Sequence, residues 1–133
     1  MTTRTNAVVE LIPAGTSNAA SNTTRGRADI RQNFGGTLTV KLTNGATGPT
    51  VAPTVNILIA HDTSGTMPAA GSAGAVWKTL YPSVVGDSVA NSVNEYQFPI
   101  DMGSGHYLEV EVTGNTIQPV TCEAYLSYVS NVA

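Results

Sequence analysis

The chain has 133 residues, of which six are basic and nine are acidic, so its net charge is −3 and its pI is about 5.1. This length suits one domain that can bury a core without help from a metal or a disulfide. Basic residues are too few to follow a phosphate backbone, which excludes nucleic acid as an expected partner. No apolar run approaches the ~18 residues of a membrane span and no secretory signal is visible, so we expect no membrane partner and synthesis in a cytoplasm.

The N-terminal third predicts two strands separated by an irregular segment. Residues 1–5 form an expected N-terminal arm, and Asn6–Ile12 is an expected strand that ends at Pro13. Residues 16–24 are rich in Ser, Thr, Asn and Ala and have no periodicity, which predicts a flexible loop. Arg25–Gln32 follows as a short strand with its arginines on one side.

The middle of the chain gives the strongest strand signal. Along Gly36–Asn44 apolar residues alternate with threonine and lysine, which places one set on each face of a strand. Pro53–His61 is a second strand rich in β-branched residues, and Asn-Gly and Gly-Pro turn signals lie between the two. Residues 63–74 form an expected loop.

Four more strands are expected in the C-terminal half: Ala75–Tyr81 ending at Pro82, Glu95–Ile100, His106–Thr113 and Val120–Val129. Pro99 predicts an edge position for the second of these, because proline cannot donate to a neighbouring strand. In the third, alternation places Leu108, Val110 and Val112 inward and Tyr107, Glu109 and Glu111 outward. In the last, Cys122 points inward.

About eight short strands with turn signals between them predict an all-β, single-domain antiparallel β-sandwich over residues 1–133, of jelly-roll or Ig-like type. A closed barrel is the alternative.

Side chains with chemical potential are present but do not form a recognisable constellation. His61 and Asp62 are adjacent at a strand end, where Asp favours a turn. Asp101, His106, Glu109 and Glu111 match no calcium-loop spacing. Cys122 is the only cysteine and lies at an inward position. We therefore expect no catalytic, metal or cofactor site and no enzyme.

Four segments of the sequence resemble the corresponding segments of one known protein family: residues 35–45 (GGTLTVKLTNG), 47–50 (TGPT), 74–78 (GAVWK) and 109–116 (EVEVTGNT). Together they resemble capsid decoration (cement) proteins of tailed bacteriophages, over roughly residues 30–130. The matching motifs are turns and strands, so no binding residues carry over.

The resemblance implies a virion component on the capsid exterior, made in the host cytoplasm. It implies a homo-oligomer, expected to be a trimer, that binds the major capsid protein and stabilises contacts between its subunits. Low charge and a surface rich in hydroxyl and amide groups suit such contacts. The residues expected at capsid or subunit interfaces are Thr2, Thr3, Arg4, Arg25, Arg27, Trp77 and Tyr125.

The alternative function is a carbohydrate-binding or host-adhesion module of a phage fibre or tail. It would use surface aromatic and amide side chains, with Trp77, Tyr81, Tyr107 and Asn115 as candidates. The exposure of Trp77 discriminates between the two readings, because a sugar platform must be accessible whereas a core or subunit contact is covered.

Overall fold

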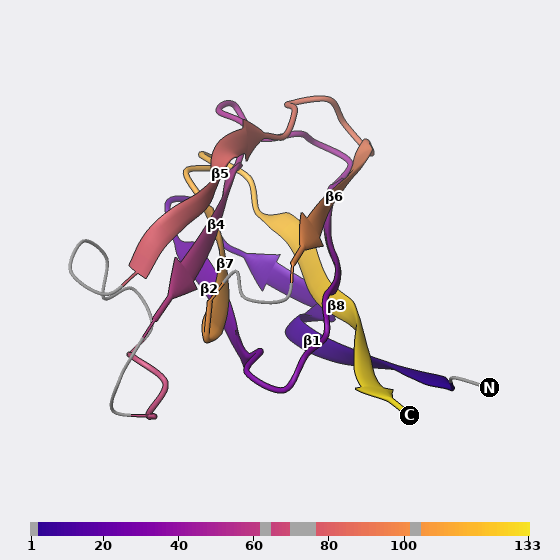
Figure 1. Cartoon of the computed structure of the whole chain (residues 1–133). Helices are drawn as coiled ribbons and strands as arrows, with labels where there is room; N and C mark the ends of the chain where they lie inside the picture. Colours follow the sequence, from indigo (N-terminus) through magenta and orange to yellow (C-terminus); the bar gives the residue numbers. More distant parts are fainter. Residues whose placement is uncertain (1–2, 62–64, 70–76, 102–104) are drawn as a thin grey trace.

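Eight strands form two four-stranded sheets in the computed structural model, which describes residues 3–61, 65–69, 77–101 and 105–133 (Figure 1). The strands are β1 (Arg4–Asn18), β2 (Thr23–Asp29), β3 (Gly36–Asn44), β4 (Thr54–Ala60), β5 (Trp77–Val85), β6 (Val93–Ile100), β7 (Tyr107–Thr113) and β8 (Val120–Val132). Among the described residues, no helix is long and apolar enough to cross a bilayer.

The strand order identifies the sandwich as a jelly roll. Sheet A has the order β1-β8-β3-β6 and sheet B the order β2-β7-β4-β5, with antiparallel pairing throughout. The pairs β4–β5, β3–β6, β2–β7 and β1–β8 are nested, as in one long hairpin rolled up into two sheets. This nesting confirms the expected antiparallel sandwich and separates it from both the Ig-like arrangement and a closed barrel.

The core between the sheets follows the period of two along each strand. Alternate residues of β3, β7 and β8 are almost fully buried, and these are Leu38, Val40, Leu42, Leu108, Val110, Val112, Val120, Cys122, Ala124 and Leu126. The inward position predicted for Cys122 is therefore confirmed.

The prolines in strands, Pro13 in β1, Pro82 in β5 and Pro99 in β6, all lie on sheet edges. β6 is the outer strand of sheet A and contains Pro99, which confirms the predicted edge. β5 is the outer strand of sheet B and continues through Pro82 to Val85, so the expected strand end at Pro82 is wrong. An edge strand tolerates a proline because its missing N–H faces no neighbour.

The irregular segment expected at residues 16–24 is mostly strand. β1 continues through Pro13 to Asn18, and only residues 19–22 separate it from β2. Thr16 lies four positions after Ile12 in β1, whereas their partners in β8, Cys122 and Ala124, are only two positions apart. The extra residues of β1 form a bulge in the segment that contains Pro13 and Gly15. Gly15 has a φ of +81°, which a residue without Cβ adopts readily.

A second, smaller core lies on the outer face of sheet B and contains Ala60, Trp77 and Tyr107, with Leu58 and Met67 packed against it. Residues 65–69 of the β4–β5 connection cover it: Pro68 accepts a hydrogen bond from Arg27, and the indole Nε1 of Trp77 donates to the carbonyl of Ala69 at 3.0 Å. Tyr107 and Glu109 alternate with the inward residues of β7 as predicted, but both are buried, so their expected exposure to solvent is wrong.

Candidate interaction surface

The chain ends form a two-stranded ribbon that extends past the sandwich. β8 pairs with β3 only as far as Tyr128, but with β1 as far as Val132. Beyond that, the amide of Thr3 donates to the carbonyl of Ala133 at 2.6 Å and the amide of Ala133 donates back at 2.9 Å. Both termini therefore lie together at one end of the molecule (Figure 1).

The ribbon corrects the expected N-terminal arm for residues 3–5, whereas residues 1–2 lie outside the described part of the chain. Arg4 and Thr5 belong to β1 and face Val132 and Asn131 of β8, so these residues are part of the sheet. Thr2 was also an expected contact residue, and it lies outside the described residues.

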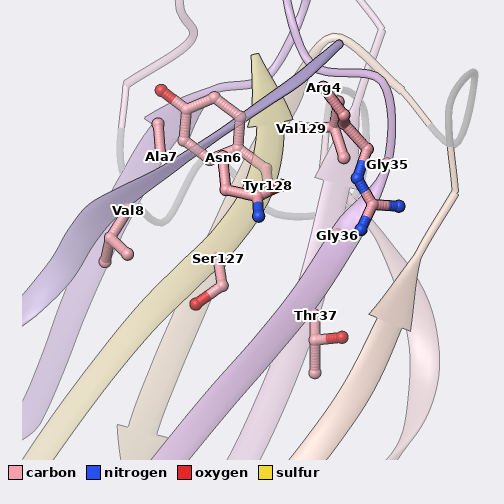
Figure 2. A pocket seen from close by; sticks show the side chains of 10 residues that line it. All are labelled: Arg4, Asn6, Ala7, Val8, Gly35, Gly36, Thr37, Ser127, Tyr128 and Val129. Atoms are coloured by element: carbon pink, nitrogen blue, oxygen red, sulfur yellow. The ribbon is translucent and has the colours of Figure 1, made fainter. Parts of the chain in front are cut away.

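A hollow of about 430 Å³ opens where the ribbon leaves β3. Its lining comes from β1, β8 and the start of β3: Arg4, Asn6, Ala7, Val8, Gly35, Gly36, Thr37, Ser127, Tyr128 and Val129 (Figure 2). Arg4 carries the only charge of this lining, and Asn6, Thr37 and Ser127 contribute amide and hydroxyl groups.

Two of the residues that line the hollow are glycines, Gly35 and Gly36. A Cβ at Gly36 would lie 2.1 Å from the carbonyl oxygen of Ser127, far inside any real contact, so only glycine fits beside β8 there. Gly35 has a φ of +98°, and it accepts a hydrogen bond from the amide of Val129 at 3.0 Å. The missing side chains leave the floor of the hollow as bare backbone, with Arg4 directed toward Gly36 in Figure 2.

The outer face of sheet A is the broad surface next to the hollow. Tyr125 lies on it between Glu10 of β1 and Thr39 of β3, and it is half-buried. Lys41 pairs with Glu123 of β8 and Glu95 of β6 in the next outward row. This places the predicted Tyr125 on an outward surface of the sheet that also contains Arg4, but the two residues lie at different points along it, opposite Glu10 and Val132 respectively.

Arg25 and Arg27, which were expected to act with Arg4, lie on the other sheet. Arg25 forms an ion pair with Glu111 across β2 and β7 at 3.0 Å, and Asn56 donates to the same carboxylate at 2.8 Å. Arg27 donates to the carbonyl of Pro68. The predicted basic contact surface is therefore split, with Arg4 on sheet A and two already engaged arginines on sheet B.

The residues proposed for sugar stacking do not form a surface. Trp77 and Tyr107 belong to the second core and Asn115 is fully buried, while Tyr81 packs against Phe98 with ring centroids 5.3 Å apart. A Trp77 that is 2 % exposed is closed to a ligand in this conformation. The glycan hypothesis thus loses the residues on which it was based.

Asn115 instead organises a buried amide network. Its Nδ2 donates to the carbonyls of Asn18 at 3.1 Å and Gln118 at 2.9 Å, and its Oδ1 accepts from Nδ2 of Asn18 at 2.6 Å. Thr24 donates to Oδ1 of Asn18 at 2.8 Å. The network joins the β1–β2 turn to the β7–β8 connection, which explains the burial of two uncharged polar side chains.

Among the described residues, no three or more His, Cys, Asp or Glu side chains come together in a way that could hold a metal ion. His61 lies just after β4, with its ring 5.3 Å from that of His106, and Asp62 lies outside the described residues. Glu111 is occupied by Arg25, and burial raises the pKa of the Cys122 thiol to about 11, which suppresses the nucleophilic thiolate.

Comparison with known proteins supports the fold and leaves the family open. No family model and no curated sequence matches the chain. VP2 of infectious bursal disease virus, solved as a subviral particle, is similar over 95% of this chain and 32% of its own, with 9% identity and a TM-score of 0.56. The cleaved K3 adhesin domain of Lys-gingipain from Porphyromonas gingivalis is similar over 84% of this chain and 72% of its own, with 12% identity and a TM-score of 0.54.

At such low identity these similarities show the β-sandwich alone, which this chain shares with viral and adhesin proteins. The assignment to capsid decoration goes further than the fold and is a proposal.

Proposed function

We propose that this chain is a capsid decoration protein of a tailed bacteriophage. It binds the outer surface of the head as an oligomer, which we expect to be a trimer, and stabilises contacts between major capsid subunits. It needs no cofactor and catalyses no reaction. Made in the host cytoplasm, it ends on the exterior of the virion.

The observation that carries this proposal is the hollow beside the edge strand β1. An extended segment of a capsid subunit can lie in it against the bare backbone of Gly35 and Gly36. Asn6, Thr37 and Ser127 offer hydrogen bonds that suit a peptide, and the guanidinium of Arg4 suits a carboxylate. The proposal therefore includes an acidic residue on the capsid segment that faces Arg4.

The rest of the molecule supports a structural role. A small, rigid jelly roll with few charges can sit in many copies on a repeating surface, where modest contacts add up. Each copy can add stability through a small docking area, because the capsid subunits that it contacts are already held in place in the shell.

Co-sedimentation with assembled, undecorated heads tests the proposal. Wild-type protein is expected to bind saturably, and Arg4→Ala to raise the dissociation constant by about tenfold, the loss of one charge-assisted contact. Arg25→Ala is the matched control, because Arg25 is an exposed arginine of sheet B whose ion pair contributes little stability.

The two parts of the proposal fail separately. Wild-type protein that does not bind heads overturns the decoration function. If heads bind the Arg4→Ala variant as tightly as wild type but do not bind the Arg25→Ala variant, the capsid contact lies on sheet B and the hollow has no part in capsid binding.

The lining of the hollow also favours a second candidate, a carbohydrate-binding or host-adhesion module. Amide and hydroxyl groups from Asn6, Thr37 and Ser127 surround a hollow that Tyr128 also lines, a combination that sugar sites use. Because Trp77 lies on the other sheet, glycan screening of the wild-type protein and of the site variant Ser127→Ala tests this better than Trp fluorescence. Glycan binding that Ser127→Ala abolishes would favour adhesion.

A further inference from the structure

Four connections meet at the end of the sandwich opposite the chain termini, and we call them together the loop end. They are residues 19–22, 45–53, 86–92 and 114–119, all described by the structure. The β5–β6 connection lies at the top of Figure 1, whereas both termini lie at the lower right.

Backbone hydrogen bonds join these loops to one another. The amide of Thr50 donates to the carbonyl of Thr116 at 3.1 Å, and the amide of Thr116 donates to Val51 at 3.3 Å. The amide of Asn91 donates to Gly45 at 2.8 Å, and that of Ser21 to Asn115 at 2.8 Å. The loop end is thus a preorganised surface, and binding through it requires little ordering.

Three branched apolar side chains project from it into solvent. Val51 is 53%, Val89 63% and Ile117 71% exposed, each from a different loop. The hydrogen bonds to Thr116 hold Val51 beside the segment that contains Ile117. The loop of Val51 also lies against the loop of Val89, because a Cβ on Gly48 would contact the backbone of Ser88 and Val89. Exposed apolar groups gathered on one rigid surface mark an interaction site more than scattered ones do.

Ile117 is also held in an unfavourable backbone conformation. Its φ is +71°, which is costly for a β-branched residue. All of the non-glycine residues with positive φ in the described part of the chain, Ser21, Asn91 and Ile117, lie on the loop end. In an isolated subunit, Ile117 is unfavourable both because its backbone is strained and because its apolar side chain is exposed to water. A contact that buries the side chain removes the second of these costs.

The distribution of charge indicates what covers this surface. The loop end includes one charged residue, Asp87, whose carboxylate accepts hydrogen bonds from Ser92 and Asn94, whereas both sheet faces and the opposite end carry ionised groups. At a rotation axis each residue meets its own copy, so a charge there would meet a like charge. A subunit of net charge −3 therefore approaches its copies most easily through this end, where Asp87 is the one charged residue and its carboxylate already accepts hydrogen bonds within the subunit.

We propose that copies of this chain associate through the loop end, with Val51, Val89 and Ile117 at the contact. The contact leaves the hollow beside Gly35 free, because that hollow lies at the opposite end of sheet A, where β3 begins. The inference concerns the isolated protein and does not require capsid binding.

Light-scattering mass measured over a range of concentrations tests it. Wild-type protein is expected to be an oligomer, and Ile117→Asp to raise its dissociation constant at least about tenfold, because each new carboxylate meets its copy. Ile117→Gly removes the side chain and the strain together, so it should also weaken association while the monomer melts no lower than wild type. Phe34→Asp, at the other end and 49% exposed, is the matched control and should keep the wild-type mass.

Three results would overturn the inference: a wild-type protein that is monomeric at every concentration, an Ile117→Asp protein with an unchanged mass, or dissociation by Phe34→Asp of equal size. Head binding is measured in parallel. An oligomer that dissociates as expected but ignores heads would refute the decoration function and leave this inference standing. If the wild-type protein is a monomer and the Ile117→Asp variant no longer binds heads, the loop end contacts the capsid and not another copy of this chain.

Discussion

Replacing Asn115 by alanine removes the centre of the buried amide network. Three hydrogen bonds of its side chain disappear, two donated to the backbone carbonyls of Asn18 and Gln118 and one accepted from the side-chain Nδ2 of Asn18. Asn18 keeps its bonds with Asn22 and Thr24, so its side chain loses one of its partners and not all of them.

The expected cost follows from these bonds. Each contributes about 0.5–1.5 kcal/mol net, and burial without a partner adds to the penalty for the groups left behind, which gives about 2–4 kcal/mol in total. This is a large part of the roughly 5–15 kcal/mol that stabilises a typical domain. For a chain of this size, the melting temperature should fall by about 10 °C.

Urea unfolding followed by Trp77 fluorescence measures the loss, because this single tryptophan is buried in the second core and changes its surroundings when the chain unfolds. Asn131→Ala is the control: Asn131 is exposed, and its replacement should change stability by less than about 0.5 kcal/mol. If Asn115→Ala costs no more than this control, the network does not hold the two loops together and the reasoning fails.

Three further predictions concern single residues. Gly36→Ala should destabilise the protein by about 1–3 kcal/mol or more, because the new Cβ meets the backbone of Ser127, and urea unfolding will detect it; an unchanged midpoint would show that β3 shifts freely. Hydrogen bonds, led by that from the Ser92 hydroxyl, hold the pKa of Asp87 below its ordinary 3.8, so its carboxylate stabilises the fold above that pH and loses this effect as the pH falls through the lowered value. Stability measured against pH should therefore fall less steeply below pH 3.8 in Asp87→Asn than in wild type, and parallel curves would contradict this. The buried Cys122 thiol, whose pKa is raised to about 11, should resist a thiol reagent at pH 8 in the native protein and react in urea; rapid native labelling would show that the core opens.

Local pattern determined much of this protein. The alternation of Leu38, Val40 and Leu42 specifies one buried face whatever the strand pairs with, because side chains of a strand alternate between its faces. Pro99 restricts its strand to an edge for a reason contained in one residue, the missing donor. The same logic placed Cys122 in the core, and the number of strands and the sandwich class followed from such signals.

Contacts between distant segments decided the rest. Tyr107 and Glu109 alternate as outward residues should, yet both are buried, and Met67 of the β4–β5 connection packs against the core that contains Tyr107, which no period within β7 can reveal. Pro13 and Gly15 are turn residues in the sequence, but β8 holds them in a bulge of one continuous strand.

The candidate surfaces are the clearest case of this division. Arg4 and Arg25 were both predicted as contact residues because they lie in polar, aperiodic segments that carry most of the arginine, but Arg4 belongs to β1 of sheet A and Arg25 to β2 of sheet B. The hollow at Gly35 and the loop end with Ile117 each combine residues from three or more segments that lie far apart in the sequence. The sequence by itself determined which faces of the strands are apolar, whereas only the tertiary structure decided which polar and apolar groups share a surface, because that depends on pairing across the whole chain.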